Sequence, residues 1–126
     1  MAGLTYNKEE IEKLIGKIVQ RTMRMDLTWD WPCGVAYYGI SSAFEATGNK
    51  DYLNQMKERI DEYIELGLPD WTVNTCAMGH CLITLYEETG DEKYWNIVMS
   101  KTEYLQKKAL RFGNHVLQHT VSVNND

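Results

Sequence analysis

The segment DWTVNTCAMGHCLITLYEETGDEKYW, residues 70–95, carries the pattern that decides the fold. Between Trp71 and Tyr86 there is no Asp, Glu, Lys or Arg, so a helix formed by these residues has no face suited to water. Several polar residues nevertheless lie near its start, among them Asn74 and His80. The segment therefore predicts an interior helix over residues 72–89 whose leading end faces something other than the core.

The pattern of this segment occurs twice in the chain. Trp29, Phe44, Glu45, Thr47, Gly48 and Tyr52 stand 42 residues before Trp71, Tyr86, Glu87, Thr89, Gly90 and Tyr94. Gly48 and Gly90 suit the position just past a helix end, and Asn49 and Asp91 suit the N-cap of the next helix. Each copy thus predicts a very tight turn between two helices, as in stacked αα-hairpins.

Uncharged helices alternate with one-faced helices along the chain. Apolar residues recur at three- and four-residue steps over 8–23, 51–67 and 92–111, with charged residues on the opposite side. Residues 32–44 carry no charge and Pro32 suits the first helical position, so we expect a helix buried nearly all round. Residues 115–123 predict a short extended segment. The expected fold class is all-α: one domain, 1–126, of stacked αα-hairpins in two layers.

The composition excludes several classes of protein. A net charge of -5 over 126 residues leaves no basic surface for a nucleic-acid backbone. No apolar run approaches the roughly 20 residues that span a membrane, and the N-terminal MAGLTYNKEE is unlike a signal peptide. Because three cysteines are an odd number, Cys33, Cys76 and Cys81 are expected to be buried, reduced thiols of a cytoplasmic protein.

Three strings in the same order carry a resemblance to a known family. WDWPCGVAYYGISSAFEATGNKDYL (29–53) and VNTCAMGHCLITLYEETGDEKYW (73–95), followed by LQHTVSVNND (117–126), resemble the N-terminal part of glycoside hydrolase family 105. That family is close to family 88 and holds the unsaturated rhamnogalacturonyl hydrolases. The resemblance implies an (α/α)6 toroid with inner helices around a central pocket. The predicted helices make about two and a half hairpins, which is the N-terminal portion of such a ring.

The resemblance also implies a reaction. Family members hydrate the vinyl ether of a terminal unsaturated uronate, and an aspartic acid in a Trp-Asp-Thr segment supplies the proton. Asp126 has no Trp before it and no Thr after it, so the role is not carried over. The acid is therefore expected beyond Asp126, and these 126 residues alone are expected to be inactive. No cofactor is implied, and the expected partner is an unsaturated uronic-acid oligosaccharide.

Two polar residues are the best candidates for substrate contact. Asn74 occupies a position where several family members have an aspartate that assists binding or catalysis. Since an amide cannot titrate, Asn74 is expected to bind the sugar at the pocket mouth through hydrogen bonds; capping of the first helical turn is the alternative. His119 matches a histidine in the pocket-facing segment of the family, and a surface or hydrogen-bonded core histidine is its alternative.

Aromatic residues supply three further candidates. Trp31 and Trp29 precede an inner helix and suit a platform on which a sugar ring stacks. Anchoring of the loop against the toroid rim is the alternative, and the repeat partner Trp71 favours it for Trp29. His80 is a weaker candidate for substrate contact, because a hydrogen-bonded core histidine is the more common role within an uncharged helix.

Other interpretations are weighed against the hydrolase. Cys76 with His80, and His115 with His119, share a spacing of four, but these spacings match no compact zinc module, so no metal is expected. A non-catalytic helical-repeat module that binds a partner remains open, as does another sugar enzyme of the toroid class, such as an epimerase. An open ring should favour self-association through the toroid edge by exposing Val35, Ile40, Leu82 and Leu85.

Overall fold

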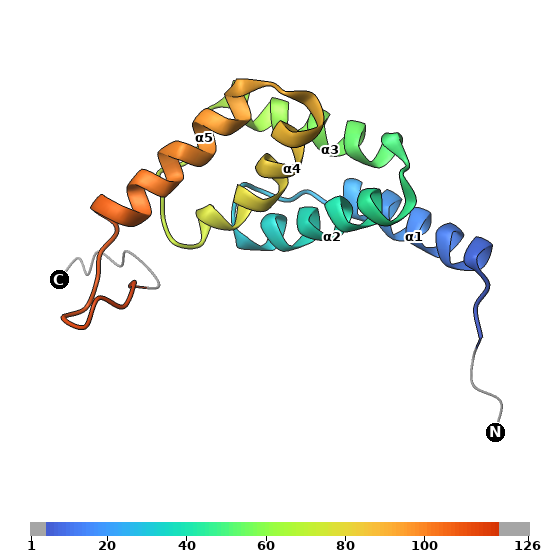
Figure 1. Ribbon diagram of the computed structural model, residues 1–126, viewed down its shortest axis with the longest axis horizontal. Helices are drawn as coiled ribbons and strands as arrows, with labels where there is room; N and C mark the ends of the chain where they lie inside the picture. The colour runs from blue at the N-terminus through green and yellow to red at the C-terminus, as the bar shows by residue number, and fades with distance from the viewer. Residues whose placement is uncertain (1–4, 119–126) are drawn as a thin grey trace.

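The computed structural model of the protein describes residues 5–118 and confirms the all-α fold class (Figure 1). The elements in chain order are α1 (Lys8–Met23), α2 (Trp31–Thr47), α3 (Lys50–Leu66), the 3-10 turn η1 (Thr75–Met78), α4 (Gly79–Thr89), α5 (Glu92–Glu103) and the π-turn η2 (Tyr104–Lys108). Within residues 5–118 no helix is long and apolar enough to cross a membrane.

Side-chain caps explain where the first two helices begin. Asn7 Oδ1 accepts the N–H of Glu10 at 2.8 Å, and the Glu10 carboxylate accepts the N–H of Asn7 at 3.2 Å, which makes a capping box. Asp30 Oδ1 accepts the N–H of Trp31 at 2.8 Å. As a result α2 begins at Trp31, and Pro32 takes the second helical position instead of the first. Both positions suit proline because a helix start leaves its N–H groups unpaired.

The two predicted hairpin turns have the same backbone conformation. Gly48 and Gly90 have φ angles of 68° and 69°, a left-handed conformation that glycine adopts without steric cost. Their N–H groups donate to the carbonyl oxygens of Phe44 and Tyr86 at 2.7 and 2.8 Å. Each glycine therefore closes the end of an inner helix and turns the chain back at once.

The side chains of the two turns also match. Thr47 Oγ1 accepts the N–H of Asn49 at 3.2 Å, and Thr89 Oγ1 accepts the N–H of Asp91 at 3.1 Å. Asn49 and Asp91 each accept, at 3.0 Å, the N–H of the residue two positions on, as N-caps do. The sequence repeat is thus a repeat of hydrogen bonds.

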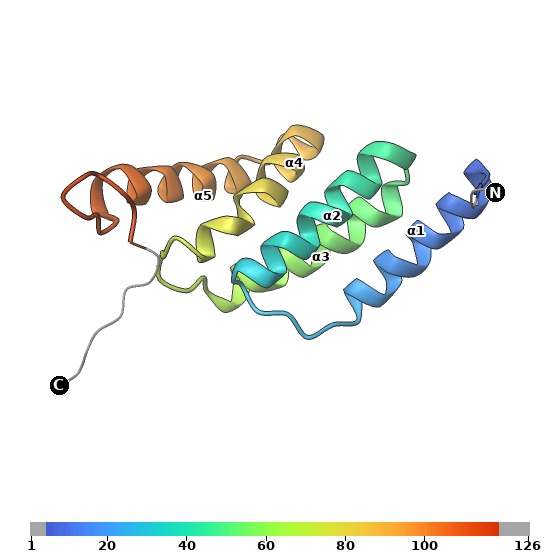
Figure 2. The same ribbon diagram turned by 90° about the horizontal axis from the view of Figure 1, so that it is seen from below.

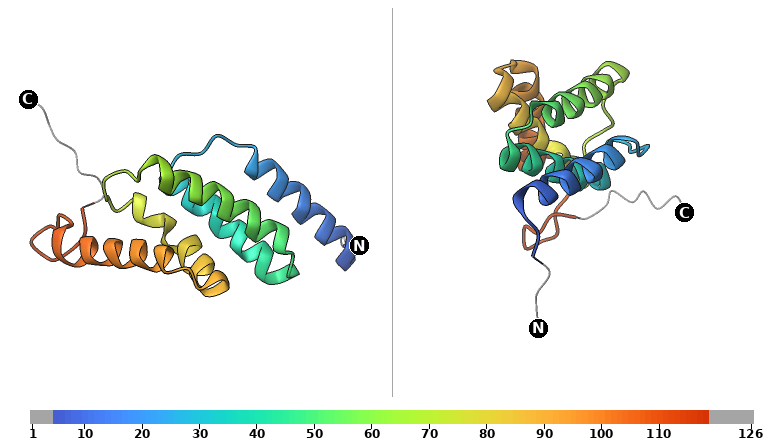
Figure 3. Two further views of the ribbon diagram at one scale, coloured as in Figure 1. Left: turned by 90° about the horizontal axis from the view of Figure 1, so that it is seen from above. Right: turned by 90° about the vertical axis from the view of Figure 1, so that its right-hand side faces the viewer.

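The helices form two layers, as the alternation predicts. α2 lies against α4, α3 packs on α2, and α5 packs on α4. Figure 2 shows α1, the α2–α3 hairpin and the α4–α5 hairpin following one another along the molecule, and Figure 3 shows α1 and α5 at opposite ends. The core lies between the layers and contains Cys33, Tyr37, Ile40, Phe44, Leu53, Met56, Ile60, Met78, Cys81, Leu82, Leu85 and Tyr94.

A polar cluster joins the outer helices α3 and α5. Asp61 accepts hydrogen bonds from Lys57 Nζ at 2.8 Å and from Tyr94 Oη at 2.5 Å, and Lys93 Nζ lies 3.0 Å from it. Burial acts to raise the pKa of Asp61, but the hydrogen bonds from Lys57, Tyr94 and Lys93 outweigh it and hold this pKa below the ordinary value of 3.8. The carboxylate is the charged partner that links the two hairpins on their outer side.

Residues 72–89 do not form one continuous α-helix. Thr75–Met78 forms a 3-10 turn, and the α-helix begins only at Gly79. The N–H of Thr72 donates to Thr75 Oγ1 at 2.8 Å, and the N–H of Thr75 donates to Thr72 Oγ1 at 3.2 Å. These hydroxyl groups satisfy backbone groups at the start of the segment and so favour a tighter turn over the regular helix.

The end of the described chain also departs from the prediction. α5 passes into η2, which the N–H of Ala109 closes by donating to the carbonyl of Tyr104 at 2.8 Å, so the helix predicted to residue 111 stops earlier. Arg111 and Leu117 form an isolated antiparallel bridge around a turn in which His115 has a φ of 65°. Up to residue 118 the expected extended segment is therefore a small loop.

The helix α2 is not buried nearly all round. Trp31, Val35 and Tyr38 are 54%, 62% and 52% exposed and share one face. Val35 is exposed as an open ring predicts, but three other residues expected at the open edge are fully packed: Ile40, Leu82 and Leu85. The absence of charge over residues 32–44 therefore marks two different surfaces, a core face and an uncharged face open to solvent.

Candidate functional site

A close backbone contact joins the start of α2 to η1. A Cβ atom on Gly34 would lie 2.7 Å from the carbonyl carbon and oxygen of Ala77, a distance that side-chain carbons do not tolerate. Glycine is required here because α2 and η1 pack without an intervening side chain. The contact fixes the register of η1 along α2.

A second contact lies one turn further along both segments. The rings of Tyr38 and His80 meet edge to face, with centroids 4.7 Å apart and an interplanar angle of 76°. Since Gly34 meets Ala77 and Tyr38 meets His80, the residue numbers increase together, and α2 runs parallel to η1 and α4, as Figure 2 also shows.

This register brings together two of the predicted site residues. Trp31 precedes Gly34 by three residues, and Asn74 precedes Ala77 by three, so both lie about one turn before the close contact. They are therefore at the same end of the parallel pair. Trp31 is more than half exposed, and Asn74 is partly exposed.

Asn74 does not cap its helix. Its φ and ψ of -65° and -43° are already helical, and its side chain makes no capping hydrogen bond. The reciprocal hydrogen bonds of Thr72 and Thr75 order the first turn instead. The capping alternative is therefore wrong, and the Asn74 amide is not engaged at the helix start.

The other candidates take different places. His80 is exposed, so the interpretation as a core histidine is wrong. Trp29 is only 6% exposed and packs edge to face on Tyr63 at 6.0 Å, which favours the anchoring role over a sugar platform. His119 lies outside the described residues.

Tyr38 is a candidate site residue that the sequence interpretation missed. It follows Trp31 by seven residues, which places both on one face of α2, and this spacing is the signal that would have identified it. We use the term inner face for the exposed surface made by Trp31, Val35, Tyr38, His80 and Ile83. It combines flat apolar rings with ring N–H and phenol groups, which suits a ligand with apolar faces and hydroxyl edges.

The inner face contains no cation of its own, because α2, η1 and α4 have no Lys or Arg. The three cysteine thiols, none of which belongs to the inner face, are also unsuited to nucleophilic chemistry. Burial raises the pKa of Cys33 to about 11 and also raises the pKa of Cys76 and Cys81, so all three stay protonated near neutral pH. Among residues 5–118, no group of three His, Cys, Asp or Glu side chains is placed to hold a metal ion.

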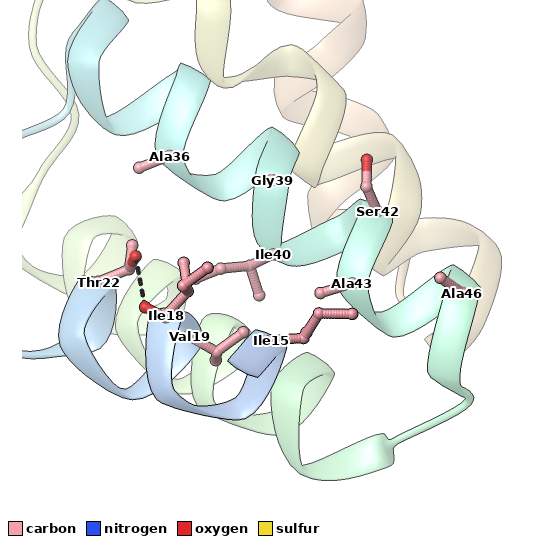
Figure 4. Close-up of a pocket in the computed structure, with 10 residues that line it drawn as sticks. All are labelled: Ile15, Ile18, Val19, Thr22, Ala36, Gly39, Ile40, Ser42, Ala43 and Ala46. Carbon is pink, nitrogen blue, oxygen red and sulfur yellow. Dashed lines mark hydrogen bonds between the residues drawn. The ribbon is translucent and has the colours of Figure 1, made fainter. Parts of the chain in front are cut away.

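An apolar groove elsewhere is distinct from this site. It has a volume of about 340 Å³ and lies between α1 and α2, where Ile15, Ile18 and Ala43 point into it (Figure 4). Its polar lining groups are the hydroxyls of Thr22 and Ser42, and Thr22 Oγ1 already donates to the carbonyl of Ile18 at 2.9 Å. No titratable side chain lines the groove, so it is a packing surface rather than a catalytic site.

Solved structures of other proteins resemble this fold closely. A crystal structure described as a possible member of the GH105 family from Klebsiella pneumoniae subsp. pneumoniae MGH 78578 matches with a TM-score of 0.86 and 22% identity. A second crystal structure, also described as a possible member of the GH105 family, matches with a TM-score of 0.85 and 21% identity; it is from Salmonella enterica subsp. enterica serovar Paratyphi A str. ATCC 9150. Each match covers 99% of this chain and 39% of the other, and at this identity it establishes the fold alone.

The sequence comparisons establish the family. The unsaturated rhamnogalacturonyl hydrolase YesR of Bacillus subtilis (strain 168) is 45% identical over 122 residues, which are 97% of this chain and 36% of that protein. This chain thus spans little more than a third of its relative. Residues 6–126 match the family described as Glycosyl Hydrolase Family 88. The resemblance recognised in the sequence is confirmed, and the chain belongs to Glycosyl Hydrolase Family 88.

Proposed function

We propose that this chain forms part of the substrate-binding wall of a glycoside hydrolase that acts on unsaturated uronyl oligosaccharides, the products of lyases in pectin degradation. The observation that carries the proposal is the placement of Trp31 and Asn74 at one end of two parallel inner segments. The 45% identity to a protein named for that activity supports the substrate class.

Each residue of the proposed site has a role that its chemistry allows. Trp31 offers an exposed indole face on which a sugar ring stacks. Asn74 supplies amide hydrogen bonds but no proton transfer, because an amide does not titrate. His80, with Tyr38 beside it, and His119 are proposed as further donors to the sugar. Trp29 supports the wall from inside.

The proposed reaction is hydration of the vinyl ether of the terminal uronate. An aspartic acid in a Trp-Asp-Thr segment beyond Asp126 is proposed as the general acid, and it needs a pKa raised toward the working pH. After water adds, the resulting hemiketal opens and releases the sugar. No cofactor takes part in this scheme. A cytoplasmic location is proposed from the three free thiols.

The test uses unsaturated rhamnogalacturonan disaccharide as the probe. A longer chain that carries the Trp-Asp-Thr segment is expected to consume it, seen as loss of the ultraviolet absorbance of the double bond. The 126-residue chain is expected to bind the disaccharide without consuming it. Trp31→Ala and Asn74→Ala should each weaken binding about tenfold or more, which corresponds to the loss of one stacking or hydrogen-bonding contact.

The outcomes separate the alternatives. Failure of the longer chain to consume any unsaturated uronide would overturn the hydrolase. Binding without loss of the double bond by the longer chain favours a binding module, and a changed sugar configuration with the double bond retained favours another toroid enzyme such as an epimerase.

A further inference from the structure

The repeat-related tryptophans Trp29 and Trp71 meet around one lysine. Lys101 of α5 is only 3% exposed, and its Nζ lies 4.4 Å from the ring centroid of Trp71 and 5.6 Å from that of Trp29. The same ammonium group donates a hydrogen bond to the carbonyl oxygen of Thr75. The Lys101 side chain thus connects the outer helix α5 to the backbone of η1 in the inner layer.

Burial of this ammonium group is costly, and the contacts that offset part of the cost involve ring faces and a carbonyl rather than a carboxylate. A desolvated cation over an indole face is stabilised by the ring, and a charge-assisted hydrogen bond to a carbonyl adds to this. Trp29 contacts the ammonium group through its ring face, while its buried Nε1–H has no hydrogen-bond partner among the described residues. The ring faces stabilise the protonated form of Lys101, and the hydrogen bond to the carbonyl is stronger when the amino group is charged.

The segment held by α5 includes Asn74. Trp71 Nε1 donates to Ser100 Oγ at 3.0 Å, and Lys101 binds the carbonyl of Thr75, the next residue after Asn74. Two adjacent residues of α5 therefore fix residues 71 and 75, on either side of Asn74. The threonine pair closes the turn between these two anchors.

We propose that Lys101 is a positioning residue: its buried ammonium group holds the turn of residues 71–75 so that Asn74 presents its amide at the inner face. This inference rests on the proposed function for the identity of the ligand. Lys101 does not touch the sugar in this arrangement, and it acts through the carbonyl of Thr75.

The proposal implies a pH dependence with opposite signs for binding and for stability. Burial lowers the pKa of Lys101 to about 8. The titratable groups that face it are Cys76 and Cys81, and both act to raise this pKa. Above about pH 8 the ammonium group is lost, the turn loosens and sugar affinity falls. The folded pKa lies below the ordinary 10.5, so the Lys101 contribution to the free energy of unfolding becomes more favourable between these values as pH rises.

The experiment compares the wild-type chain with Lys101→Met, Lys101→Arg and the control Lys108→Met, which removes an exposed lysine just past α5. Titration with unsaturated rhamnogalacturonan disaccharide should show affinity weakened about tenfold in Lys101→Met and unchanged within about twofold in Lys108→Met. Wild-type affinity should fall from about pH 7 to about pH 9.5, whereas Lys101→Arg, whose cation does not deprotonate, should show no such fall.

A second readout needs no ligand. The amide resonances of Asn74 in the free wild-type chain should move with a midpoint near pH 8, and they should not do so in Lys101→Met. Static Asn74 resonances and flat wild-type affinity over this pH range would overturn the positioning role, even if Lys101→Met fails to fold. Absence of binding at any pH would instead overturn the proposed function, and the Asn74 resonances then decide the positioning role alone.

Discussion

The register of the inner segments should depend on the absence of a side chain at Gly34. Gly34→Ala places a Cβ 2.7 Å from backbone atoms of Ala77. Backbone atoms cannot move aside by a simple rotamer change, so the two segments would have to shift apart. We expect the free energy of unfolding to fall by about 1–3 kcal/mol, measured by denaturant titration. Gly39→Ala is the control, because a Cβ there meets nothing within 4 Å. It should be neutral or stabilising by up to about 1 kcal/mol.

The three thiols should differ in reactivity because they differ in burial. Cys33 and Cys81 are 0% exposed, and burial raises the pKa of both, whereas Cys76 is partly exposed. Brief treatment with an alkylating reagent near neutral pH should modify Cys76 first, and Cys33 and Cys81 should react only after a denaturant is added. Mass spectrometry of the digested chain checks this, and equal labelling of all three in the native state would contradict the packing described.

The link between the outer helices α3 and α5 should make stability depend on acid pH through Asp61. The pKa of Asp61 is lower in the folded chain than the ordinary 3.8, so its contribution is complete above that value and is lost as pH falls through the folded pKa. Asp61→Asn should lower the free energy of unfolding by about 1–2 kcal/mol at neutral pH and flatten its acid dependence. Urea titrations across acid pH measure this. Glu62→Gln is the control, since Glu62 is 59% exposed, and an equal loss there would contradict the role of Asp61.

At the level of elements, the parts that sequence predicted well are those set by nearby residues. The hairpin turns depend on Gly48, Gly90 and their flanking hydroxyl and amide groups, which act within a few residues of the chain. The split of residues 72–89 was missed because the reciprocal bonds of Thr72 and Thr75 compete with a helix that composition alone favours.

The candidate site was predicted only in part, for a different physical reason. The shared end of Trp31 and Asn74 follows from placing polar residues at the starts of inner helices. An uncharged stripe, however, is equally compatible with a core and with an exposed wall, so Tyr38 was missed and His80 was kept only as a weaker candidate, with a core histidine as the more common role. Lys101 was missed because a lysine within an amphipathic helix is usually solvated, and its burial depends on tryptophans 30 and 72 positions away.

At the scale of the whole molecule, α1 presents more apolar surface than the described core covers. Ile11, Leu14 and Ile18 are 44%, 51% and 57% exposed, and Ile18 borders the groove against α2. We therefore expect the 126-residue chain to self-associate through α1 and this groove, rather than through the packed residues first expected at the edge. Sedimentation at increasing concentration measures association, and Ile18→Lys should shift the chain toward monomer while leaving its unfolding midpoint nearly unchanged. A wild-type monomer at high concentration would contradict this.

The matched hairpin turns constrain how this architecture can change over evolutionary time. Each turn uses only its own glycine, hydroxyl and capping group, and it makes no demand on the side chains that face outward or inward. The reversal within each hairpin therefore stays the same whatever ligand surface the inner helix displays. Such a chain can diversify its inner wall, residue by residue, at positions other than close contacts such as that of Gly34 with Ala77.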